Sequence, residues 1–146
     1  MSDKLSLSEG LIFSDLAIKE AASGKVSLIN VFSHINALAF PFQSPLLFLT
    51  MFVSGVAGGV SKIPFKIEVF RVEGNIKISE LNGEALIPPG VLETDVNEIV
   101  WPMPPMFIQA SGSYSVVITA SGSEIGKKQF QVRPLGFSAI GVSNVT

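Results

Sequence analysis

Apolar and polar residues alternate with a period of two along most of the chain. The alternating segments are short, rich in Val, Ile and Phe, and bounded by Gly, Pro, Ser or Asn, which is typical of β-strands. A further edge strand is expected near 96–101, because the surrounding segment holds five of the nine prolines and proline cannot donate to a sheet ladder. The pattern predicts strands over 10–21, 25–35, 46–56, 63–74 and 75–83, and a hairpin over 112–134.

The number and spacing of these segments indicate the fold class. Seven to nine short strands about 10 residues apart predict an all-β, immunoglobulin-like antiparallel β-sandwich. A small β-barrel is the alternative. A short helix over 14–23 is a second, local alternative. Because no repeat or linker divides the sequence, residues 1–146 are expected to form a single domain, with a C-terminal tail from about 135 that is docked or flexible.

The sequence "SGKVS" at 23–27 has two interpretations, a phosphate-binding loop or a hairpin turn. A P-loop needs a glycine five positions before the Gly-Lys pair and a Ser or Thr after the lysine. Lys19 and Val26 occupy those positions. The segment that follows also alternates like a strand, whereas a P-loop leads into a helix. We therefore expect a tight turn in which Gly24 supplies the positive φ that a hairpin requires.

Charge is scarce in this chain of 146 residues. Charged residues make up 15% of the total, below the value of about 25% that is typical of soluble domains. No Asp, Glu, Lys or Arg occurs between Lys25 and Lys62, or between Glu98 and Glu124. We therefore expect another subunit to cover part of the surface. The net charge of −2 gives no reason to expect nucleic acid or anionic lipid as a partner.

The apolar run 45–60 is too short for a membrane span, which needs about 20 apolar residues. Prolines close one end of the run and glycines interrupt the other, so a strand with both faces covered is the better interpretation. The N-terminus lacks the basic and apolar segments of a secretory signal, which makes a cytoplasmic location the expectation. The absence of cysteine excludes disulfides and thiolate metal sites.

The stretches "SDLAIKEAASGKVSLINVFSHI", "FPFQSPLLFL" and "GSYSVVITASGSEIGKKQFQV" resemble an uncharacterised family of short bacterial proteins of unknown function. Together these stretches cover about half of the chain, and their motifs are structural: strand, turn, strand and a second hairpin. The resemblance implies a β-sandwich. It implies no activity, cofactor or site residue.

Candidate chemistry is sparse. His34 is the only histidine, so a multi-histidine metal site is excluded, and the absence of a nearby carboxylate in the sequence favours a partly buried histidine over a general base. The acids Glu93, Asp95 and Glu98 fit a solvated strand face better than a calcium site, because no glycine-containing ligand loop accompanies them. No cofactor is expected.

Two aromatic loops are candidates for contact with a partner. "WPMPPMF" at 101–107 and "FPFQSP" at 40–45 hold large, adaptable side chains on proline-stiffened backbone, and such residues are enriched at interface hot spots. The alternative is that the same residues cap the core of the sandwich. The candidate contact residues are Phe40, Phe42, Trp101, Met103, Met106 and Phe107.

These features favour a non-enzymatic protein-interaction or structural module that self-associates or binds another protein. A small-ligand or carbohydrate-binding module, with Trp101 and Tyr114 stacking on the ligand, is the alternative. A hydrolase is the third hypothesis, and it is disfavoured by the single histidine and the lack of a nucleophile motif.

Overall fold

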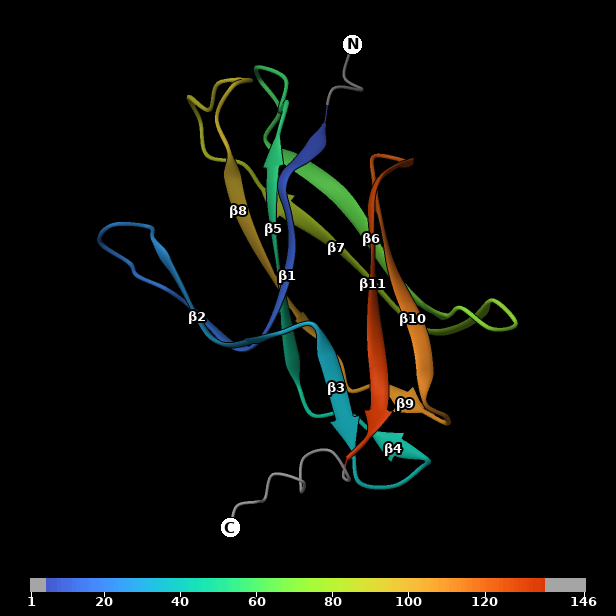
Figure 1. Ribbon diagram of the computed structural model, residues 1–146. Coiled ribbons are helices and arrows are strands. Elements are labelled where there is room, and N and C mark those ends of the chain that lie inside the picture. The colour runs from blue at the N-terminus through green and yellow to red at the C-terminus, as the bar shows by residue number, and fades with distance from the viewer. Residues whose placement is uncertain (1–4, 136–146) are drawn as a thin grey trace.

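The computed structural model describes residues 5–135, apart from the side chains of Ser8 and Glu9, and this part of the chain is built from β-strands that form two stacked sheets (Figure 1). The strands are β1 (Ser6–Lys19), β2 (Val26–Phe32), β3 (His34–Ala37), β4 (Phe42–Gln43), β5 (Leu47–Ser54), β6 (Lys62–Arg71), β7 (Ile76–Leu86), β8 (Asn97–Met103), β9 (Phe107–Ile108), β10 (Gly112–Ala120) and β11 (Ser123–Pro134).

The strands form a four-stranded sheet with the order β2-β1-β5-β8, called sheet A, and a five-stranded sheet with the order β3-β11-β10-β6-β7, called sheet B. The short strands β4 and β9 pair separately. Two separate layers confirm the predicted immunoglobulin-like β-sandwich instead of the small barrel. The predicted edge strand near 96–101 is also confirmed, since β8 lies at one edge of sheet A.

The structure rules out one local alternative and corrects one predicted strand. Residues 14–23 form no helix, because β1 continues to Lys19 and a turn follows. The strand predicted over 25–35 is split at Ser33, where the chain passes from sheet A to sheet B. Because the chain keeps its direction at this crossing, β3 runs parallel to β11, and the sandwich is therefore not purely antiparallel. The tail residues Phe137 and Ile140 lie outside the described residues.

The first hairpin confirms the turn interpretation of "SGKVS". β1 and β2 are antiparallel, with Lys19 opposite Val26. The amide of Glu20 donates to the carbonyl of Lys25 over 2.8 Å, and Gly24 has a φ of 73°. Only glycine adopts this left-handed backbone without steric cost, so the glycine belongs to turn geometry.

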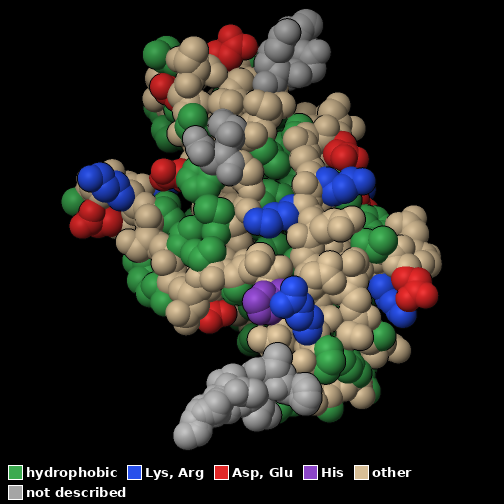
Figure 2. Space-filling model, viewed as in Figure 1, with side chains coloured by type: hydrophobic (Ala, Val, Ile, Leu, Met, Phe, Trp, Pro, Cys, Tyr) green, Lys and Arg blue, Asp and Glu red, His purple; other side chains and the backbone are tan. Residues whose placement is uncertain are grey.

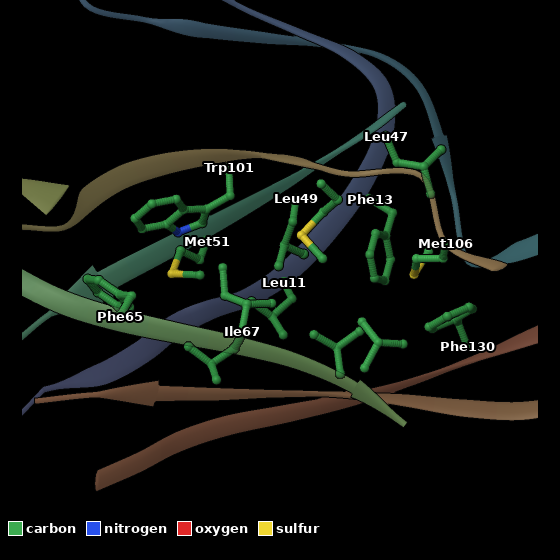
Figure 3. Close-up of a cluster of buried hydrophobic side chains, with 14 of the residues drawn as sticks. Leu11, Phe13, Leu47, Leu49, Met51, Phe65, Ile67, Trp101, Met106 and Phe130 are labelled. Atoms are coloured by element: carbon green, nitrogen blue, oxygen red, sulfur yellow. The ribbon is translucent and has the colours of Figure 1, made fainter. Parts of the chain in front are cut away.

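The core lies between the sheets and consists of the inward-facing residues of both (Figure 3). Phe65, Ile67 and Val69 are buried as the alternation predicted, and so are Tyr114, Val116, Ile118, Phe130 and Val132. Aromatic rings connect the layers. The Phe13 ring from sheet A stacks on Phe32 at 5.8 Å and meets Phe130 of sheet B edge-on at 5.3 Å.

A glycine makes room for the single tryptophan. Trp101 of β8 lies between the sheets beside Phe65, with the ring centroids 5.6 Å apart. A Cβ atom on Gly83 of β7 would lie 2.7 Å from Cζ3 of Trp101. Gly83 therefore lets the indole ring pack directly against the backbone of the opposite sheet.

A buried tyrosine ties a loop to sheet B. Tyr114 lies near the start of β10, stacks on Phe130 at 5.7 Å, and donates its hydroxyl hydrogen to the carbonyl of Ala110 over 2.6 Å. A tyrosine at a strand start that bonds backbone a few residues upstream is a recurrent feature of immunoglobulin-like sandwiches. The bond satisfies a phenol whose ring is otherwise surrounded by the core.

We expect Gly83→Ala to destabilise the protein by about 1–3 kcal/mol, because the added methyl group overpacks the contact with Trp101. The measurement is the free energy of unfolding in urea, with Trp fluorescence as the signal. Gly58→Ala is the matched control, since a Cβ there meets nothing within 4 Å. Equal effects of the two substitutions would contradict the proposed fit between Gly83 and the indole ring.

Tyr114→Phe should lower the free energy of unfolding by about 1–2 kcal/mol, because the ring is kept while the Ala110 carbonyl loses its donor. Thermal and chemical denaturation measure this change. An unchanged stability would mean that water replaces the hydroxyl at no cost.

Candidate interaction surface

The outward-facing side of sheet A is predominantly apolar. The cross-strand register places Ser14 beside Val31 and Phe48, and Leu16 beside Ile29, all on the side away from the core. The apolar side chains on this side, which we call the apolar face, are Ile12, Leu16, Ile18, Ile29, Val31, Phe48, Phe52, Val100 and Pro102. Ser14, Ser27 and Thr50 lie among them. Among the described side chains of these strands, Glu98 is the charged one on this side.

The outward-facing side of sheet B is mostly polar, although Phe70, Val117 and Leu86 also lie on it. It presents Ser113, Ser115 and Thr119 on β10 and Gln129, Gln131 and Arg133 on β11. On β6 and β7, the Lys77 ammonium lies 2.9 Å from Glu68 and 2.6 Å from Glu80. Hydrogen bonds to Glu80 and Glu68 raise the pKa of Lys77, and the hydrogen bond from Lys77, followed by that from Asn82, lowers the pKa of Glu80.

This contrast between the two sheets is informative. An antiparallel sheet with one solvated side normally alternates apolar inward and polar outward residues. Sheet B follows that rule and sheet A does not. Large exposed apolar patches are frequent at sites where proteins contact other molecules.

The most exposed part of the apolar face lies on the β1–β2 hairpin. Leu16, Ile18, Ile29 and Val31 are exposed to 40%, 48%, 41% and 60%. The hairpin projects from the body of the sandwich (Figure 1), and its tip carries the exposed residues Lys19, Glu20 and Lys25. Figure 2 shows charged side chains gathered at this tip. The apolar side chains therefore lie between a charged tip and the core.

Two small hydroxyl side chains are buried between the larger side chains of the apolar face. Ser14 and Thr50 are fully buried although they point outward, and their hydroxyl oxygens make no hydrogen bond within residues 5–135. Phe48 and Phe52 beside them are half-buried. The larger side chains thus close over the smaller ones and leave a nearly uncharged surface.

The six candidate contact residues divide into two groups. Trp101, Met103 and Met106 are buried in the core, which is the capping alternative, so these side chains are not available to a partner. The alternation of β8 turns Trp101 and Met103 inward, and the Met106 amide donates to the buried Ser44 hydroxyl over 2.8 Å.

The other three candidates reach the surface. Phe107 is exposed, while Phe40 and Phe42 are half-buried and pack on the core. Phe42 pairs with Ile108 through β4 and β9, at the end of the sandwich. These residues remain accessible, but they do not belong to the apolar face of sheet A.

His34 lies half-buried beside a groove of about 630 Å³ at the crossing from β2 to β3. The groove lining includes Asp15, Asn30, Asn36 and Phe42. The Asn30 amide donates to the Asp15 carboxylate over 3.1 Å. The groove thus joins the histidine with a carboxylate, but its lining includes no serine, so no serine hydrolase triad forms there.

Neither metal ligands nor membrane helices stand out in the described part. Within residues 5–135, no group of three His, Asp or Glu side chains is placed to hold a metal ion. The same residues include no helix long and apolar enough to cross a membrane. The run 45–60 that raised the membrane question contains β5, an inner strand of sheet A.

Sequence reasoning missed the apolar face itself. The signal was present in the charge-free gap from Lys25 to Lys62, which contains both β2 and β5. In β5 the alternation fails, since residues of both parities are apolar. A strand of that kind was expected to be covered on both sides, and the described residues cover it fully on one side only.

The chain is similar to a protein family and to a solved structure. No curated protein matches the chain. An immunoglobulin-like protein from Pseudomonas aeruginosa has a similar structure, with a TM-score of 0.42 and 9% sequence identity over 90% of this chain and 98% of that one. The model of a family of unknown function, DUF6941, matches residues 9–133. The chain described here therefore belongs to the DUF6941 family.

Proposed function

We propose that this chain is a non-enzymatic protein-interaction module that associates with a second copy of itself through the apolar face and its border. The observation that carries the proposal is the difference between the two outward sides, apolar on sheet A and polar on sheet B. In a free monomer the apolar side of sheet A would stay exposed to water, which is unfavourable in free energy.

The composition of the apolar face favours a second copy over a charged partner. With Glu98 as its charged side chain among those described, the face offers little to attract an acidic or basic protein. For the same reason two copies meet without the repulsion that like charges would cause. An uncharged surface is self-complementary in this respect, which suits a symmetric interface.

The size of the surface sets the expected strength. Four strands about 4.8 Å apart and about seven residues long, at about 3.4 Å per residue, give a sheet side of roughly 450 Å² in projection. A standard stable complex buries about 800 Å² of accessible surface on each partner. We therefore expect a weak dimer whose population depends on concentration.

The structure does not support the residues on which the small-ligand or carbohydrate-binding alternative was based. Trp101 and Tyr114 were the residues expected to stack on a sugar or metabolite, and both are buried in the core. Stacking needs an exposed ring face, so neither residue can serve in this conformation. The groove beside His34 supplies polar and apolar groups, but nothing in it selects one chemical class of ligand.

Sedimentation equilibrium from low to high micromolar concentration tests the proposal. We expect a reversible monomer–dimer equilibrium, and we expect Ile29→Lys to weaken it by about tenfold or more, because an ammonium group is then desolvated at the interface.

Ile76→Lys is the matched control, since Ile76 is exposed to 50% on β7 at the far edge of sheet B. This variant should dimerise like the unaltered protein. A strictly monomeric parent chain, or equal weakening by both substitutions, would refute self-association through the apolar face. Circular dichroism on both variants confirms that they fold.

A further inference from the structure

Each sheet of the sandwich has free edges, and a free strand edge can pair with another chain. In the described residues the edge strands are β2 and β8 in sheet A and β3 and β7 in sheet B. Natural proteins protect such edges with charges, prolines, short strands or covering groups. Among these four edges, β2 lacks such protection.

The other edges are protected. β7 carries the exposed residues Lys77, Glu80 and Glu84, and β8 carries Glu98 and Pro102. β3 has four residues, too few for an extended ladder.

The first part of β1 lies beside β11 and pairs with β5 on its other side. There the Lys128 ammonium donates to the carbonyl of Leu11 over 2.6 Å. A lysine therefore occupies the acceptor that another strand would use.

β2 lacks charges and proline. Its sequence is VSLINVF, seven residues, and it is the outermost strand of the projecting hairpin. Asn30 interrupts its regular geometry with a φ of 57°. The segment Val26–Ile29 therefore remains as a regular, uncharged edge.

The direction of the backbone groups in this segment follows from the turn. The Glu20 amide donates to the Lys25 carbonyl, so the backbone groups of Lys25 point toward β1. Because these directions alternate in an antiparallel ladder, the backbone N–H and C=O groups of Ser27 and Ile29 also point toward β1. Val26 and Leu28 thus direct their N–H and C=O groups outward, away from β1.

We infer that two copies of this chain join by antiparallel pairing of their β2 edges about a two-fold axis at Ser27. This inference rests on the proposed self-association and specifies its geometry. Val26 of one copy then exchanges main-chain hydrogen bonds with Leu28 of the other, so the outward groups of both are satisfied. Sheet A becomes continuous across the dimer.

The pairing also joins the apolar faces of the two copies side by side. In one continuous sheet the exposed side chains of both hairpins lie on the same side, and the axis at Ser27 places Ile29 of each copy opposite Lys25 of the other. The charged hairpin tips point in opposite directions along the seam, which keeps their like charges apart.

A cysteine at the two-fold axis tests the geometry directly. The chain has no cysteine, so a disulfide in Ser27→Cys can join only the two introduced residues. Cα atoms in a non-hydrogen-bonded antiparallel pair are about 4.5 Å apart, within the range of a disulfide. We expect mild oxidation to convert most of the Ser27→Cys protein to a covalent dimer at concentrations where the parent chain dimerises.

Asn82→Cys is the matched control, because Asn82 is also an exposed polar residue on an edge strand, β7. It should cross-link only slowly, through random collisions. Val26→Pro adds a second arm, since proline at the first residue of a strand removes an outward N–H and leaves the ladder to β1 intact. This substitution removes a hydrogen bond on each side of the axis, so the dimer should weaken by about tenfold or more.

The outcomes separate the two proposals. A dimer in sedimentation that Ser27→Cys cross-links no better than Asn82→Cys overturns edge pairing and leaves self-association intact. A parent chain that stays monomeric at every concentration overturns both. Hydrogen exchange adds a third readout: the Val26 and Leu28 amides should gain protection as concentration rises. Protection that is independent of concentration would assign the edge to another segment of the same chain and overturn the inference.

Discussion

The contact between the two sheets through large inward side chains is the interaction on which the rest of the structure depends. Phe13, Phe130 and Tyr114 form a connected set of rings that spans both layers, and Trp101 fills the space beside Phe65 because Gly83 has no side chain. Aromatic burial of this kind dominates core energetics. With the inward sides held together, each sheet presents one side outward, and the character of those two sides decides what the protein can contact.

The two outward sides have different physical consequences. Sheet B exposes hydroxyls, amides and the ion pairs of Lys77, all of which are well hydrated. Sheet A exposes branched aliphatic and aromatic groups, and the side chains of Ser14 and Thr50 are buried between them. Among the described residues, an apolar side of this extent occurs on sheet A and not on sheet B. The uncharged β2 edge lies at the border of that side, so pairing of two such edges would join two apolar sides into one continuous surface.

The segment from β2 to β3 illustrates how one chain crossing shapes the surface. β2 leaves sheet A at Ser33, and β3 joins sheet B beside β11. Because the chain crosses to sheet B, the outer edge of β2 stays unpaired among the described residues. The groove beside His34 lies at the same crossing. The same short stretch thus produces both the free edge and the concave surface. The crossing also shifts His34 from the face that alternation predicted, shared with Leu28 and Phe32, to the start of β3 in sheet B.

The sequence by itself determined the local features, namely the strands, most of their buried faces and the Gly24 turn, because each depends on a period of two or on one residue's backbone freedom. The inward positions of Phe65, Ile67, Val69, Tyr114 and Phe130 follow directly from that period. Only the tertiary structure decided the break at Ser33, the parallel β3–β11 pair and the burial of Trp101, Met103 and Met106. It also decided which apolar side of β5 faces the core. Those features depend on which strands meet across a distance in sequence, and a side chain pattern that is apolar on both sides carries no information about which side a second sheet will cover.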